Sequence, residues 1–253
     1  SVLSVMGGYI DGVYVGTAPN ANYVLLKSED ESSESKVEED NWIAAAEFAD
    51  SVGADVINSS LGYNTFDGGF GDYAYSDFDG RTTVVSQGAV WAHRKGILVV
   101  NSMGNEGSSS WQYMLSPADT DSILSIGGAD LGDNYVGFAS VGPTYDGRQK
   151  PNVSALAAGV FVLTNSNTTQ PGSGTSFAAP LISGLAACLW QADPTLTNYQ
   201  VLELIERSAH QYNNPDTLLG YGIPNFAYAL STIGMEENTT FSNLKVYPVP
   251  FSD

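Results

Sequence analysis

Short apolar runs alternate along this chain with longer segments in which apolar residues recur every three or four positions. Runs of the first kind are typical of buried strands, and segments of the second kind are typical of amphipathic helices. Parallel strands need a long crossover between them, so this alternation predicts an α/β fold with a mostly parallel sheet. We expect strands at residues 23–26, 55–60 and 97–101, and strand and turn segments at 122–128 and 137–142.

Four segments carry the helical pattern, and the residues at their ends are typical of helix caps. Asp40 is a good N-cap for the first helix, and Gly53 is suited to end it. Thr197, with Gln200 three residues later, forms a capping-box sequence for the last. We expect helices over residues 40–53, up to about 95, 176–191 and 197–208.

Composition and charge narrow the class of protein. The chain has 253 residues, 43% of them hydrophobic, which is enough to bury a sizeable core. Its formal net charge of −19 repels phosphate backbones and anionic lipids, which argues against a nucleic-acid partner. No apolar stretch approaches the length that crosses a bilayer, so we expect no membrane insertion. Cys188, in an apolar run, is expected to be buried.

Ser176 is the first candidate for chemistry. It follows a glycine-containing loop and opens the most apolar helical segment of the chain. A serine at a helix N-terminus has an exposed hydroxyl and an unpaired backbone N–H that points at a developing negative charge. The same features would also suit a plain N-cap serine. The segment does not fit the Gly-x-Ser-x-Gly elbow of other hydrolases, because Ala178 stands at the fifth position.

Asn105 is the second candidate. It lies between Gly104 and Gly107, shortly after the strand expected at 97–101. An asparagine here could be an ordinary turn residue. Its amide could also reach forward as a donor to an oxyanion, which is a strong contribution to acyl-transfer catalysis.

These segments resemble those of the subtilisin-like serine peptidases. Residues 174–180 are similar to the nucleophile signature of that family, and residues 104–107 are similar to its oxyanion-asparagine loop. Further segments match in the family's order, namely residues 16–21, 56–62, 150–153, where Asn152 replaces the family's Asp, and 220–225. The resemblance covers most of residues 1–230. It implies a three-layer fold with a mostly parallel central sheet flanked by helices.

The resemblance also implies roles for individual residues. Ser176 would attack the scissile carbonyl, while Asn105 and the backbone N–H of Ser176 would hold the oxyanion. The strand that ends in Ser-Leu-Gly would pair with the substrate backbone and border the pocket for the P1 side chain. The substrate-binding residues expected on this basis are Ser60, Leu61, Gly62, Gly104 and Thr175. No cofactor is required and no residue is assigned to a metal, although the family often uses Ca²⁺.

The proton acceptor is not evident in this chain. In the family, an Asp and a His precede the serine, in the order Asp, His, Ser. His93 and His210 lie at the ends of expected helices and do not fit. Residues 1–8 resemble the stretch that follows the catalytic His, so we expect both missing residues upstream of residue 1. The fold is therefore expected to be incomplete at its N-terminus: without the Asp-bearing strand, the parallel sheet should have a hole in its middle that exposes apolar surface and unpaired backbone groups. We expect such a fragment to be inactive and not to fold alone.

The C-terminal residues have a different character. Residues 234–245 read as a polar linker after a peptidase domain at 1–233, and residues 246–253 contain Val-Tyr-Pro-Val-Pro. That motif resembles the start of the C-terminal sorting domain of type IX secretion in Bacteroidetes. A proline-rich linker is the alternative interpretation.

The sequence thus predicts a secreted or cell-surface serine endopeptidase that forms an acyl-enzyme on Ser176. Its expected partners are peptide or protein substrates, the N-terminal part of the same protein and the type IX secretion machinery. Three acidic residues fall where the family's distal subsites lie, namely Glu38, Glu39 and Asp40. They suggest a preference for substrates with basic or polar side chains at those subsites. The alternative is a secreted pseudopeptidase that acts as a binding or surface module.

Overall fold

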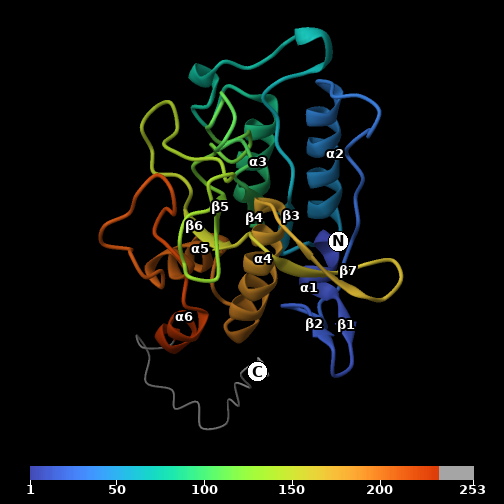
Figure 1. The fold of residues 1–253 in the computed structure, drawn as a ribbon, viewed down its shortest axis with the longest axis vertical. Coiled ribbons are helices and arrows are strands. Elements are labelled where there is room, and N and C mark those ends of the chain that lie inside the picture. Colours follow the sequence, from blue (N-terminus) through green and yellow to red (C-terminus); the bar gives the residue numbers. More distant parts are fainter. Residues whose placement is uncertain (234–253) are drawn as a thin grey trace.

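A four-stranded parallel sheet forms the middle layer of the molecule (Figure 1). We describe it from a computed structural model, which describes residues 1–233. The expected linker at 234–245 and sorting segment at 246–253 lie outside the described residues. The strand order is β3-β4-β5-β6, and every neighbouring pair is parallel. The strands are β3 (Val56–Ser59), β4 (Leu98–Ser102), β5 (Leu124–Ala129) and β6 (Val153–Leu156).

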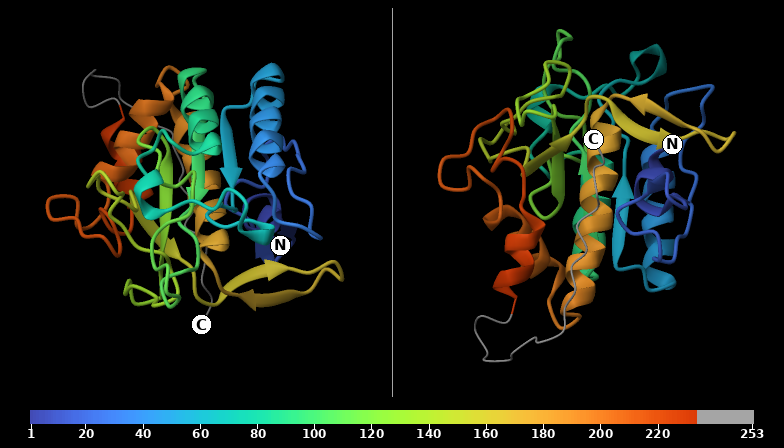
Figure 2. Two further views of the ribbon diagram at one scale, coloured as in Figure 1. Left: turned by 90° about the horizontal axis from the view of Figure 1, so that it is seen from above. Right: turned by 60° about the horizontal axis from the view of Figure 1, so that its bottom comes forward.

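Helices cover both faces of this sheet, as the two further views in Figure 2 show. The large helices are α2 (Val37–Ser51), α3 (Val84–Arg94), α4 (Thr175–Ala192) and α5 (Asn198–Arg207). The remaining elements are α1 (Val2–Gly7), β1 (Tyr9–Ile10), β2 (Tyr14–Val15), β7 (Val160–Leu163), β8 (Thr169–Gly172), α6 (Phe226–Thr232) and two 3₁₀ turns at Asp67–Gly69 and Tyr75–Asp77. The three-layer α/β architecture predicted from the sequence is confirmed.

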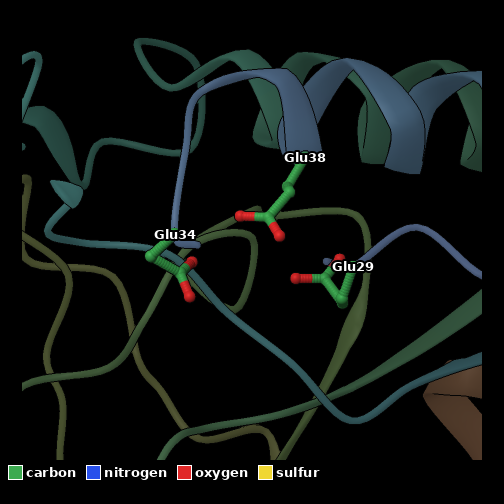
Figure 3. Close-up of side chains that lie close together, drawn as sticks. All are labelled: Glu29, Glu34 and Glu38. Atoms are coloured by element: carbon green, nitrogen blue, oxygen red, sulfur yellow. The ribbon is translucent and has the colours of Figure 1, made fainter. Parts of the chain in front are cut away.

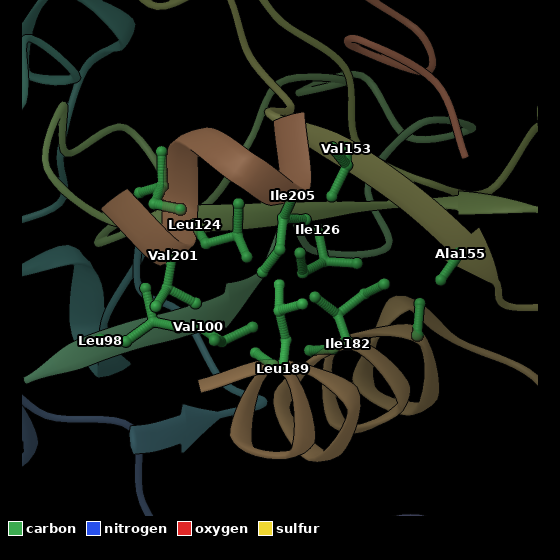
Figure 4. Close-up of a cluster of buried hydrophobic side chains, with 14 of the residues drawn as sticks. Leu98, Val100, Leu124, Ile126, Val153, Ala155, Ile182, Leu189, Val201 and Ile205 are labelled. Atoms are coloured by element: carbon green, nitrogen blue, oxygen red, sulfur yellow. The ribbon is translucent and has the colours of Figure 1, made fainter. Parts of the chain in front are cut away.

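The alternation of side chains along β4 explains the three layers. Leu98 and Val100 belong to the hydrophobic cluster that includes Ile182 of α4 and Ile205 of α5 (Figure 4). Val99, which points to the opposite face, belongs to the cluster formed with α2 and α3. Successive residues of a strand face opposite sides, so a continuous apolar run is what a strand buried on both faces requires.

Residues 23–26 do not form the buried strand that the sequence predicts. They belong to no strand, and Tyr23, Val24, Leu25 and Leu26 are 37%, 54%, 72% and 42% exposed. A strand needs a hydrogen-bonding neighbour, and no described residue supplies one here. Strand β3 lies at the edge of the sheet, with Val56 and Ile57 only partly buried. The described sheet therefore has an open edge at β3, and the apolar segment 23–26 has no strand partner among the described residues.

Some expected boundaries also change. Helix α2 begins at Val37, not after Asp40, because the Glu38 carboxylate accepts hydrogen bonds from the backbone N–H groups of Ser35 and Asp30 and so anchors the first turn. Cys188 is exposed, and its thiol donates to the Thr17 carbonyl oxygen at 3.4 Å.

Other boundaries hold. The expected strand regions at 55–60, 97–101 and 122–128 correspond to β3, β4 and β5. Residues 137–142 form no strand, and only Val141 takes part in an isolated bridge. The capping box of Thr197 and Gln200 is confirmed.

A buried lysine contacts Asn152, the residue that stands where the family has Asp. Lys150 Nζ donates to the Ile123 carbonyl oxygen at 3.2 Å, to Ser125 Oγ at 2.9 Å and to Asn152 Oδ1 at 2.9 Å. Burial lowers the pKa of Lys150 to about 7. The amide of Asn152 donates to Glu206 Oε1 at 2.6 Å, and burial raises the pKa of this carboxyl. The amide of Asn152 thus bridges Lys150 and Glu206 without setting a second carboxylate against Glu206.

We expect Asn152→Asp to destabilise the full-length protein by about 1–3 kcal/mol, because it sets a carboxylate against Glu206 and removes a buried donor. The double variant Asn152→Asp/Glu206→Gln restores a donor at that contact and should regain most of the loss. Denaturant unfolding of the three proteins measures this. A double variant no more stable than Asn152→Asp would contradict the explanation.

Candidate active site

The site lies where helix α4 begins, beside the carboxyl ends of the parallel strands. Gly174 precedes the helix with a φ of 146°, a backbone conformation that residues with a Cβ rarely adopt. Its N–H donates to the Ala157 carbonyl oxygen at 2.8 Å, just beyond β6. A glycine is needed here because the chain must turn sharply from β8 into α4. This turn places Ser176 in the first turn of the helix.

Thr175 joins this helix to the loop after β4. Its backbone N–H donates to Asn105 Oδ1 at 2.9 Å, and its hydroxyl donates to the Gly104 carbonyl oxygen at 3.0 Å. The N–H of Gly104 returns a bond to Thr175 Oγ1 at 3.2 Å. Thr175 and Gly104 are buried, so these bonds are protected from water.

The orientation of the Asn105 amide follows from these bonds. Its oxygen is held by Thr175, so its NH₂ group points away from that contact, and no described residue accepts a hydrogen bond from it. The side chain itself is exposed. A fixed, solvent-facing amide next to a helix N-terminus is a suitable donor for a developing oxyanion.

Ser176 and Ser60 contact each other through both backbone and side chain. Ser176 Oγ lies 3.4 Å from the Ser60 carbonyl oxygen, and Ser60 Oγ donates to the Ser176 carbonyl oxygen at 3.0 Å. Ser176 is half-buried. The structure thus brings the serine directly to the end of β3, where the substrate-aligning strand was expected.

The remaining expected substrate residues surround this point. The carbonyl oxygen of Leu61 accepts from Asn101 Nδ2 at 3.2 Å. Gly62 and Gly104, from the loops after β3 and β4, both contact Leu115: a Cβ on Gly62 would lie 2.6 Å from Leu115 Cβ, and one on Gly104 would lie 2.8 Å from Leu115 Cγ. Sequence reasoning did not single out Leu115, because nothing in its local sequence marks it.

Neither histidine contacts Ser176. His93 Nδ1 lies 3.0 Å from Asn198 Nδ2, and burial lowers the pKa of this imidazole. His210 Nδ1 accepts from the Ile223 N–H at 2.9 Å. Within residues 1–233, Ser60 supplies the one hydrogen-bond partner of the Ser176 hydroxyl, and no basic side chain reaches it.

The acidic residues expected at distal subsites serve the fold. Glu39 is fully buried, and its carboxylate accepts from Tyr73 Oη at 2.8 Å, from the Val85 N–H at 3.1 Å and from Lys36 Nζ at 3.1 Å. Glu38, also buried, accepts the two backbone bonds that anchor α2. Their charges are therefore committed to the protein's own groups, and only Asp40 of the three is exposed.

A separate cluster of carboxylates was missed by the sequence reading. Oxygen atoms of Glu29, Glu34 and Glu38 all lie within 4.8 Å of one another (Figure 3). They line an open hollow of about 340 Å³ with Asp67. Burial, together with the neighbouring carboxylates, raises the pKa of Glu34. Oxygen ligands of this kind could hold Ca²⁺. The Glu38 carboxylate already accepts two backbone N–H bonds, and Glu29 Oε1 accepts from the hydroxyls of Tyr63 and Ser28, so we assign no ion.

The chain is similar in sequence to proteins of one family. Residues 4–222 match the Subtilase family, peptidase S8. Subtilisin DY of Bacillus licheniformis is 32% identical over 196 residues, which is 77% of this chain and 63% of that protein. The serine protease AprX of Bacillus subtilis is 27% identical over 87% of this chain and 53% of its own length. The chain thus spans between half and two thirds of these relatives.

Solved structures show the same fold. The self-cleaved protease domain of PatA superposes with a TM-score of 0.73 at 23% identity, covering 91% of this chain and 80% of that one. MycP1 from Mycobacterium smegmatis has a TM-score of 0.71 at 20% identity, covering 98% of this chain and 73% of its own. These structures define the class of fold, and the family match over residues 4–222 defines the class of protein. The chain belongs to the subtilase family.

We expect Thr175→Val to slow the labelling of Ser176 by a fluorophosphonate about 10- to 100-fold in the full-length protein. The substitution removes the hydroxyl bonds with Gly104 and leaves only the backbone N–H of residue 175 to hold Asn105. Thr175→Ser keeps the hydroxyl and should label at nearly the rate of the unaltered protein. Labelling rates followed by mass spectrometry measure this. Equal rates for the Val and Ser variants would show that the Thr175 hydroxyl does not position the site.

Proposed function

We propose that this protein is a secreted serine endopeptidase in which Ser176 forms an acyl-enzyme and Asn105 stabilises the oxyanion. The observation that carries the proposal is the fixed amide of Asn105, held by Thr175 beside the serine at the start of α4. Membership in the subtilase family supports the same reaction class.

The chemistry follows from that arrangement. Ser176 Oγ attacks the carbonyl carbon of the scissile bond while a base takes its proton, and the electron pair of the C=O bond moves to the oxygen. The Asn105 amide and the Ser176 N–H donate to that oxygen. The tetrahedral intermediate collapses, the protonated amine leaves, and water later hydrolyses the ester.

The base in this proposal is a His, oriented by an Asp, from a segment that precedes Ser1. The support is the absence of a base at Ser176 among residues 1–233 together with the open edge at β3. The exposed apolar residues 23–26 and the half-buried Val56 and Ile57 offer unpaired backbone and apolar surface to another strand. That segment would be the partner that completes the sheet.

Export is the remaining part of the proposal. None of the helices in the described part of the chain is long and apolar enough to cross a bilayer. The Val-Tyr-Pro-Val-Pro motif at 246–250, outside the described residues, resembles a type IX sorting signal. We propose secretion to the medium or the cell surface by this route.

The decisive test is labelling of the full-length protein by a fluorophosphonate. We expect label on Ser176 and none on Ser176→Ala. Asn105→Ala should lower kcat for peptide hydrolysis about 100- to 1000-fold, the magnitude known for the corresponding loss in a subtilisin.

Label that survives in Ser176→Ala would remove this serine from the mechanism. A full-length protein that takes no label and cleaves no peptide would favour the pseudopeptidase, a binding or surface module. The specific observation behind that second candidate is the lack of a base near Ser176 in the described residues.

The completed sheet makes a separate prediction about Leu25. If another strand buries this side chain, Leu25→Glu should lower the free energy of unfolding of the full-length protein by about 2–3 kcal/mol. The matched control is Phe70→Glu, since Phe70 is 84% exposed in the loop after β3 and should change stability by about 0.5 kcal/mol or less. Denaturant unfolding gives both values, and equal values would contradict burial of Leu25.

A further inference from the structure

Leu115 lies in the position where the expected P1 pocket should be open. Its Cβ contacts the backbone of Gly62, and its Cγ and Cδ1 contact the backbone of Gly104. Gly62 lies two residues after Ser60, whose carbonyl oxygen accepts from the Ser176 hydroxyl. Gly104 immediately precedes Asn105, whose side-chain oxygen accepts from the Thr175 N–H. The isobutyl group of Leu115 therefore occupies the space between the two walls beside the nucleophile.

The backbone around Leu115 holds it in place from both sides. Its N–H donates to the Met103 carbonyl oxygen at 3.0 Å, just before Gly104. The next residue, Ser116, exchanges two backbone hydrogen bonds with Tyr63, just after Gly62, at 2.8 and 3.1 Å. The loops that carry Gly62 and Gly104 thus also fix the backbone position of Leu115 between them.

Leu115 is not a core residue that happens to lie nearby. Its neighbour Met114 is fully buried and packs with Phe78, Met103 and Ala118. Leu115 is only half-buried and belongs to none of the hydrophobic clusters of the described residues. Leu115 thus packs against two glycine backbones, Gly62 and Gly104, and keeps part of its surface exposed.

We propose that Leu115 closes the floor of the P1 pocket and restricts this enzyme to substrates with small P1 side chains such as Gly, Ala and Ser. The inference rests on the proposed endopeptidase function and names its substrate class. An extended substrate that pairs with Ser60 to Gly62 and presents its scissile carbonyl to Ser176 must direct its P1 side chain between Gly62 and Gly104. The isobutyl group fills that space, so an aromatic or long aliphatic side chain collides with it.

The test uses the full-length protein and two chromogenic peptides that are identical except for Ala or Phe at P1. We expect kcat/KM to favour Ala by about 10-fold or more. In Leu115→Gly, the ratio of kcat/KM for the Phe peptide to kcat/KM for the Ala peptide should rise about 10- to 100-fold. The same ratio should rise less in Leu115→Ala. Leu131→Ala, at a side chain 87% exposed in the loop between β5 and β6, is the control and should leave the ratio unchanged.

The unaltered protein tests the inference even if the variants fold poorly, because the P1 residues of its cleavage sites in a denatured protein can be identified by mass spectrometry. Small residues at these sites support the inference. A preference for Phe or Leu, or a ratio unchanged in a folded Leu115→Gly, overturns it while leaving the endopeptidase intact. Absence of both fluorophosphonate labelling and cleavage overturns the proposed function, and the inference with it.

Discussion

The link between Thr175 and the loop after β4 is the interaction on which the site depends. Helix α4 and that loop come from distant parts of the sequence, and three hydrogen bonds at Thr175 set their relative position. A nucleophile and an oxyanion donor are useful only when their separation is fixed before substrate arrives. The burial of Thr175 and Gly104 strengthens these bonds because water does not compete for them.

The three-layer packing keeps this link in register with the strands. β4 contributes Leu98 and Val100 to the cluster with α4 and α5, and Val99 to the cluster with α2 and α3. Strand β4 is therefore packed on both faces, and this packing fixes the position of the loop that follows its carboxyl end. Helix α4 packs directly against β3, the edge strand of this sheet. This packing brings Ser176, at the start of α4, into contact with Ser60, which follows β3.

Buried charged side chains in this fold are hydrogen-bonded to nearby polar groups. Glu39 is satisfied by a tyrosine hydroxyl, a backbone N–H and Lys36, and it thereby ties α2 to the start of α3. Asn152 plays a comparable part between Lys150 and Glu206. Buried charges with fully assigned partners cost less than unpaired ones, so an acidic chain can keep carboxylates within its structure.

The sequence by itself determined the α/β class, the main helices, three of the four sheet strands and the candidate pair Ser176 and Asn105. These features depend on local periodicity, on caps and on glycines at sharp turns, all of which are legible over a few residues. Only the tertiary structure decided that residues 23–26 find no strand partner within residues 1–233, that Glu29, Glu34 and Glu38 converge, and that Leu115 lies between Gly62 and Gly104. Such contacts join residues from separate loops and strands, and no local pattern records which neighbours the sheet will bring together.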